Sequence, residues 1–146
     1  MRTITDLACG GVIALAIIGT CARADSGPDE ADICLDAAAA AARDSGVPED
    51  VLIAVSMVET GQDGQPWPWA VNIGGESHRP GTEDDAVRLV ELTLQSGITN
   101  IDLGCFQLNL HWHSKGFQSV EDMLDPISNA QYAAHLLAGK YDMTGD

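Results

Sequence analysis

Basic residues are scarce in this sequence, and their scarcity excludes one class of partner. The 146 residues include 7 Lys+Arg against 22 Asp+Glu, which gives a formal net charge of −15 at pH 7. Binding to nucleic acid depends on Lys and Arg side chains that neutralise phosphates. We therefore expect no nucleic-acid partner. Hydrophobic residues make up 45% of the chain, which predicts a folded globular protein rather than a disordered one.

The sequence also lacks the common signatures of cofactor and metal sites. It contains no GxxxxGK phosphate loop, no GxSxG nucleophile turn and no HExxH zinc motif. His111 and His113 are two residues apart, which would place them on different faces of a helix, and no third ligand accompanies them. We expect neither a cofactor nor a bound metal.

Long apolar runs are limited to one N-terminal segment. Residues 7–20 form an apolar run, Arg2 precedes it, and a small-x-small pattern ends at Ala24. Because the run is short for a membrane-spanning helix, residues 1–24 are predicted to be a secretory signal peptide, which leaves residues 25–146 as one exported domain. The periplasm is the expected location. A retained membrane anchor and a lipoprotein are the alternatives.

Cysteines are few, and the predicted signal peptide contains half of them. Cys9 and Cys21 lie in that segment, and Cys34 and Cys105 remain in the exported domain. An oxidising compartment favours a disulfide between such a pair. Two free buried cysteines are the alternative.

Capping residues, glycines and prolines divide the exported part into helices joined by short connections. The apolar residues between these signals keep a helical spacing in most segments, and the helix after Pro48 is so apolar that we expect it to be buried. Short strands are expected at 69–73, before a Gly74-Gly75 turn, and at 98–104. The fold class is therefore mainly α with a minor hairpin. The predicted helices are 31–46, 48–61, 82–97, 120–124 and 126–141.

Glu59 is the acidic residue with the most unusual position. It follows the segment VLIAVSMV and lies two residues before the helix-ending Gly61. Burial and the negative end of the helix dipole both disfavour ionisation, so both are expected to raise its pKa. A carboxylic acid that stays protonated near neutral pH can act as the general acid in glycosidic bond cleavage. A glutamate at an exposed helix end, without a catalytic role, is the alternative.

Four segments, taken in order, carry a resemblance to a known family. They are the helix around Glu59, the segment Trp69 to Asn72, the segment Ile101 to Asn109, and the helix that begins at Asp125-Pro126. Together they resemble the lytic transglycosylases of the SLT domain class, which are lysozyme-like enzymes. The third segment is similar to the Asp-x-Gly-Cys-x-Gln form of one subgroup.

The resemblance implies an α+β lysozyme-like fold in which a small hairpin or loop lines the active-site groove. The implied reaction cuts the β-1,4 bond between N-acetylmuramic acid and N-acetylglucosamine in peptidoglycan and forms 1,6-anhydro-N-acetylmuramic acid. Glu59 would act alone, first as acid and then as base. Amides and aromatic rings suit sugars, because amides donate and accept hydrogen bonds and rings cover pyranose faces. The implied substrate-binding residues are Trp69, Asn72, Gln107, Asn109 and Tyr132.

Other functions stay open at this point. Asp102 could serve as a second carboxylate in a lysozyme-type hydrolysis. A non-catalytic peptidoglycan-binding or assembly module, acting with an envelope-spanning secretion or conjugation apparatus, is a further alternative, and an acidic structural protein is the third. The family usually continues with another helix, so a C-terminally truncated domain is an alternative to a complete one. We expect a monomer.

Overall fold

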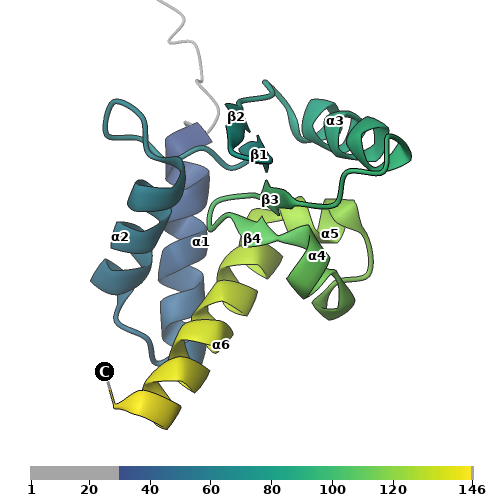
Figure 1. The fold of residues 1–146 in the computed structure, drawn as a ribbon. Helices are drawn as coiled ribbons and strands as arrows, with labels where there is room; N and C mark the ends of the chain where they lie inside the picture. The colour runs from purple at the N-terminus through teal and green to yellow at the C-terminus, as the bar shows by residue number, and fades with distance from the viewer. Residues whose placement is uncertain (1–29, 146) are drawn as a thin grey trace, which may run out of the picture.

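The computed structural model describes residues 30–145 as a mainly helical chain with one small antiparallel sheet (Figure 1). The predicted signal peptide, residues 1–24, lies outside the described residues. Within the described part, no helix combines the length and the apolar composition that crossing a bilayer requires. The prediction of a mainly α chain with a minor sheet is confirmed.

Three helices form one half of the molecule, at the left of Figure 1. α1 (Glu30–Ser45) packs against both α2 (Glu49–Thr60) and α6 (Pro126–Thr144). Gly46 ends α1 with a φ of +76°, a conformation that glycine adopts without steric cost. Small side chains where α1 and α6 meet let the two helices pack closely. The buried small residues of these two helices are Cys34, Ala37, Ala38, Ala41, Ala130, Ala133 and Ala134.

α2 is less buried than its composition predicts. Its buried side chains, Leu52, Ser56 and Thr60, are spaced by four residues and form one narrow stripe. Val58 on another face is 84% exposed. The expectation of a buried helix is therefore wrong for the described residues, because α2 packs mainly against α1 and none of the described elements covers its outer face.

The other half contains a four-stranded sheet in the order β2-β1-β3-β4, with every neighbouring pair antiparallel. β1 (Val71–Ile73) and β2 (Glu76–His78) form the predicted hairpin, and Gly74 and Gly75 both have positive φ in its turn. β3 (Ile101–Leu103) was also expected. β4 (Leu108–Asn109) is a strand that the sequence did not predict.

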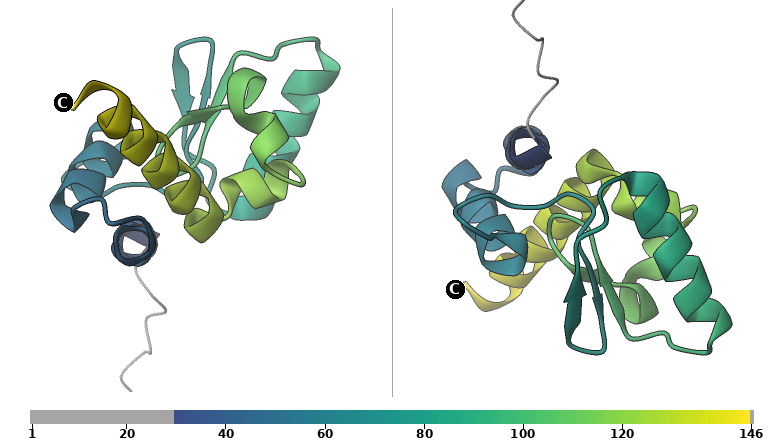
Figure 2. Two further views of the ribbon diagram at one scale, coloured as in Figure 1. Left: turned by 90° about the horizontal axis from the view of Figure 1, so that it is seen from below. Right: turned by 90° about the horizontal axis from the view of Figure 1, so that it is seen from above.

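Short helices surround the sheet. α3 (Glu83–Gln95) begins at Thr82, whose hydroxyl accepts a hydrogen bond from the Asp85 backbone N–H, and α5 (Val120–Leu124) begins at Ser119 in the same way. α3 packs against α5, and α5 packs against α6, so the two halves are joined through these contacts. Figure 2 shows both halves from two further directions. α4 (Leu110–His113) and a 3-10 turn (Ser114–Gly116) follow β4 directly.

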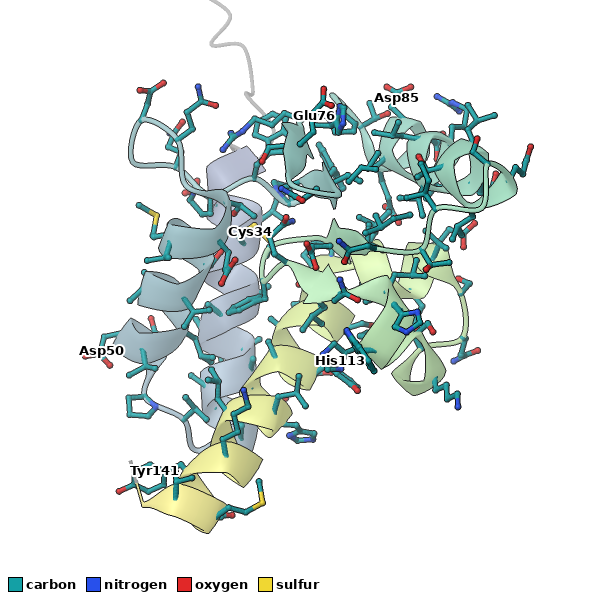
Figure 3. The ribbon with its side chains drawn as sticks, in the orientation of Figure 1. Cys34, Asp50, Glu76, Asp85, His113 and Tyr141 are labelled. Atoms are coloured by element: carbon teal, nitrogen blue, oxygen red, sulfur yellow. A yellow bond between two sulfur atoms is a disulfide. The ribbon has the colours of Figure 1, made fainter. Side chains whose placement is uncertain are left out.

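The predicted disulfide between Cys34 and Cys105 is present, with the two Cα atoms 5.6 Å apart. Both cysteines are fully buried. The bond joins α1 of the helical half to the turn between β3 and β4, at the centre of the molecule in Figure 3. The helical half and the sheet therefore share a covalent link as well as a hydrophobic core.

Candidate active site

A pocket of about 260 Å³ lies between the C-terminal end of α2 and the β1–β2 hairpin. Its lining comes from the helix end at 59–62, from residues 70–71 and 77–79 of the hairpin region, and from Gln107 in the β3–β4 turn. Residues far apart in the sequence therefore converge on one concave surface. Two of the predicted site residues, Glu59 and Gln107, are brought together there.

Glu59 lies in the last turn of α2 and reaches this pocket. Much of the residue is exposed, yet the surrounding protein removes enough water from the carboxyl group to raise its pKa from the ordinary value. The negative charge of Asp102 is the second cause and acts in the same direction. The predicted rise in the pKa of Glu59 agrees with the structure in its direction and in burial as a cause, and Asp102 is a contribution that the sequence did not reveal.

Polar side chains form a row across one face of the sheet. Asn72 is the Cα partner of both Ser77 on β2 and Asp102 on β3, and Asp102 is the partner of Asn109 on β4. Directly paired residues of antiparallel strands point to the same face, so these four side chains share one face. The flanking Val71 and Leu103 are buried on the opposite, core side.

Hydrogen bonds fix this polar row in place. The Asn72 amide donates to Ser77 Oγ at 3.2 Å, while its oxygen accepts from the Gly75 backbone N–H at 2.9 Å. The Asn109 amide donates to Asp102 Oδ1 at 2.8 Å. The orientation of the Asp102 carboxylate is therefore set by Asn109. Ser77 extends the row into the pocket, where Glu59 lies.

Gln107 occupies a strained backbone position. Its φ of +45° is uncommon for a residue other than glycine, and such strain is typical of functional positions. The side-chain amide donates to the carbonyl oxygens of Ala70 and Gly104, both at 3.1 Å. These bonds tie the β3–β4 turn to the start of β1. The Gln107 side chain is thereby held at the edge of the pocket.

A buried asparagine on α6 supports the same β3–β4 turn through hydrogen bonds. Asn129 on α6 is fully buried, and its oxygen accepts a hydrogen bond from the Phe106 backbone N–H at 3.0 Å. Its amide donates to the carbonyls of Leu103 and Met123 at 3.1 and 2.8 Å. A side chain at Gly104 would come within 2.6 Å of the Asn129 amide, so glycine is required there. Asn129 and the disulfide together define the position of the turn.

Four predicted binding residues lie outside the pocket lining: Trp69, Asn72, Asn109 and Tyr132. Asn72 belongs to the polar row of the sheet, beside Ser77. Trp69 is partly buried against the core and meets Trp67 edge to face at 6.1 Å. Tyr132 packs on Phe117 and lies 3.3 Å from His113 Nδ1 through its hydroxyl oxygen. Asn109 is at the far end of the polar row.

The chain was compared with known proteins. No family model matches it, and neither a curated protein nor a solved structure matches it significantly. A function therefore has to be inferred from the residues of the site. Within residues 30–145, no group of three or more His, Cys, Asp or Glu side chains is arranged to hold a metal ion.

Sequence reasoning missed the residues that the β2 strand and its exit contribute to the pocket. Ser77, His78 and Arg79 all line it. A signal for Arg79 was available, because it is the only Lys or Arg between Arg43 and Arg88. No local pattern linked that segment to Glu59, since the two meet only in the folded chain.

Proposed function

We propose that this protein is a lytic transglycosylase that cleaves peptidoglycan with Glu59 as its single catalytic acid and base. The observation that carries the proposal is the position of Glu59, which faces the pocket at the end of α2 next to the polar row of the sheet. The raised pKa favours the protonated form that a general acid needs at the start of the reaction. The four resembling segments of the sequence support the same reaction class.

In the proposed reaction, the Glu59 carboxyl group donates its proton to the oxygen that bridges N-acetylmuramic acid and N-acetylglucosamine. The bond from that oxygen to C1 of the muramic acid unit breaks, and the N-acetylglucosamine portion leaves with the proton. Glu59, now a carboxylate, accepts the proton of the muramic acid 6-hydroxyl while that oxygen bonds to C1. The product is a 1,6-anhydro sugar, no water is consumed, and Glu59 ends protonated as it began.

The remaining parts of the site would bind the glycan. Asn72 and Asn109 present amides on one sheet face, and Gln107 presents one at the pocket edge. The side-chain nitrogens of Gln107 and Asn109 each donate two hydrogen bonds within the protein, so their side-chain oxygens are the atoms left to accept hydrogen bonds from sugar N–H and hydroxyl groups. Glu59 lies at a helix end between the helical half and the sheet-containing half of the molecule. A lysozyme-like fold is expected to have this arrangement. We infer that the glycan lies along this polar row.

Hydrolysis is the second candidate, and one observation favours it. Asp102 lies close enough to Glu59 for its charge to raise the Glu59 pKa, so a second carboxylate is available near the site. It could direct a water to C1. The hydrogen bond from Asn109 gives Asp102 another role, which is to orient the sheet edge. Anhydro product formation is therefore the proposal, and hydrolysis is its alternative.

The test is digestion of purified peptidoglycan followed by mass spectrometry of the released fragments. Anhydro-muramic ends are expected, whereas reducing ends would indicate hydrolysis. Glu59→Gln should lower the rate by at least about 100-fold, because general acid catalysis contributes on that order. Glu49→Gln is the matched control, since it removes the same charge at the opposite end of the same helix. Full activity of Glu59→Gln would exclude both reactions.

The cellular setting proposed here follows from the predicted signal peptide and the resemblance. An exported, periplasmic and monomeric enzyme would reach the wall directly, and local opening of peptidoglycan for an envelope-spanning secretion or conjugation apparatus is a suitable role. Binding to insoluble peptidoglycan without any release of fragments would instead indicate the non-catalytic assembly module.

A further inference from the structure

Among the described residues that line the pocket, Arg79 is the only Lys or Arg. The described residues contain one ion pair, between Arg88 and Asp85, so no carboxylate of this part of the chain neutralises Arg79. The chain as a whole carries a formal charge of −15. Arg79 therefore places a positive charge without a carboxylate partner among the described residues in the same pocket as Glu59, in a strongly acidic protein.

The guanidinium group of Arg79 is held in place before any ligand binds. One Nη donates a hydrogen bond to the Thr60 carbonyl at the end of α2, directly after Glu59. The group also lies over the Trp67 ring, with Cζ 5.8 Å from the ring centroid. Two of its contacts therefore fix the position of the positive charge relative to Glu59.

Trp67, whose ring lies under the Arg79 guanidinium, is held by hydrogen bonds at its backbone and at its indole ring. Its backbone N–H donates to Thr60 Oγ1 at 3.1 Å, and its indole N–H donates to the Pro80 carbonyl at 2.9 Å. Ordering a long side chain normally costs conformational entropy on binding. In this site, contacts within the protein already order the Arg79 side chain, so ligand binding loses less conformational entropy.

The remaining N–H groups of Arg79 are available to a ligand. A guanidinium carries five donors in one plane, and the structure assigns a protein acceptor to one Nη atom alone. A planar fork of this kind matches a carboxylate, which can accept two parallel hydrogen bonds. The chemistry that fits the unused donors is therefore an anionic oxygen pair near the bond that Glu59 would cleave.

We propose that Arg79 binds a carboxylate carried by the lactyl arm on C3 of the muramic acid unit, and that this contact selects peptidoglycan over neutral chitin-type glycans. The inference rests on the proposed function, because it assumes that the glycan occupies the pocket. The carboxylate has two possible sources, the lactyl group itself in a denuded strand and the stem peptide attached to it. Arg79 supplies the attraction that an acidic protein otherwise lacks for an acidic polymer.

The first experiment changes the ligand and leaves Arg79 intact. Affinities of the Glu59→Gln protein, which should bind without turnover, are measured by calorimetry for a denuded peptidoglycan tetrasaccharide, its methyl ester and a chitin tetrasaccharide. The free acid should bind about tenfold tighter than the ester, as expected for loss of a charge-assisted hydrogen bond. The ester should resemble chitin. The proposal would be overturned if the free acid and its ester bound equally well, both as denuded strands and as peptide-bearing strands.

The second experiment removes the cation in the same Glu59→Gln background. Arg79→Gln should lose about tenfold in affinity for the acid and less than about twofold for chitin. Arg88→Gln is the matched control, because Arg88 lies on α3 in an ion pair with Asp85 and does not line the pocket. An equal loss for acid and chitin would mean that Arg79 only supports the helix end, which would overturn the proposal.

A peptide-bearing tetrasaccharide identifies the source of the carboxylate. Arg79-dependent binding of the denuded strand assigns the lactyl carboxylate, and dependence restricted to the peptide-bearing strand assigns the stem peptide. Failure of the proposed function looks different: either the wild-type protein releases no fragments, or the Glu59→Gln protein releases them at the wild-type rate, whatever the acid and ester affinities are.

Discussion

At the scale of single residues, the proposed reaction depends on the raised pKa of Glu59. Withdrawal of water by the surrounding protein is the larger cause of its raised pKa, and the charge of Asp102 is the smaller one. Activity that requires a protonated Glu59 falls as pH rises through that pKa. Any change that weakens either cause therefore moves the alkaline fall in activity to lower pH.

Asp102→Asn tests this relation. The substitution removes the negative charge but keeps an oxygen that can accept the hydrogen bond from Asn109. The Glu59 pKa should fall toward its ordinary value, so the alkaline limb of the rate against pH should shift to lower pH while the maximal rate is retained. Initial rates on solubilised peptidoglycan across pH measure this. Asp84→Asn on α3 controls for net charge, and loss of all activity in Asp102→Asn would instead favour hydrolysis.

Asn129→Ala tests the support of the site turn. The change leaves the Phe106 N–H and the carbonyls of Leu103 and Met123 without their partner, in a fully buried setting. The free energy of unfolding should fall by roughly 3 kcal/mol, since each unsatisfied buried group costs about 1–3 kcal/mol and partial relaxation reduces the sum. Urea denaturation measures the change. Gln131→Ala, which removes an exposed hydrogen bond to Asp44, should cost under about 0.5 kcal/mol.

At the scale of secondary-structure elements, the disulfide joins α1 to the β3–β4 turn, which contains Gln107 of the pocket lining. Cys105 precedes Gln107 by two residues, and Cys34 anchors it to α1. The covalent link spans a sequence separation of 71 residues, so it restricts the unfolded chain considerably. Its loss should affect stability and the position of Gln107 together.

Reduction of this disulfide should lower the free energy of unfolding by about 2–4 kcal/mol, the range typical of native disulfides. Thermal melting with and without dithiothreitol measures the loss, and activity should decline in parallel because the turn loosens. A Cys34→Ala/Cys105→Ala variant should melt at the temperature of the reduced protein and should not respond to the reductant. Equal melting temperatures of the oxidised and reduced wild type would contradict the assignment.

At the scale of the whole molecule, the excess of acidic residues opposes folding through mutual repulsion. Salt screens exposed charges, and the formal charge of −15 is large for 146 residues. At pH 7 the melting temperature should therefore rise by a few degrees between about 0.05 and 0.5 M NaCl. Near the isoelectric point of about 4.2 the same salt should have little effect. A melting temperature independent of salt at pH 7 would contradict this prediction.

The sequence determined the five helices that it predicts and, within a few residues, their ends, but not the short α4. Thr82, Ser119 and Gly46 mark helix ends through hydrogen bonds and backbone angles within a few residues, so local chemistry is sufficient to predict them. The pairing of the cysteines followed because two remained after the predicted signal peptide. The rise in the Glu59 pKa was predictable from the apolar residues that precede it.

Only the tertiary structure decided which residues meet across the chain. β4 was missed because a two-residue strand is stabilised by its partner, and its own two residues give almost no periodic signal. The exposed face of α2 depends on which elements cover it, which its apolar sequence does not specify. Asp102 and Arg79 reach the surroundings of Glu59 through strand register and a long-range hydrogen bond. Contacts between distant segments fix these positions, and no local pattern encodes them.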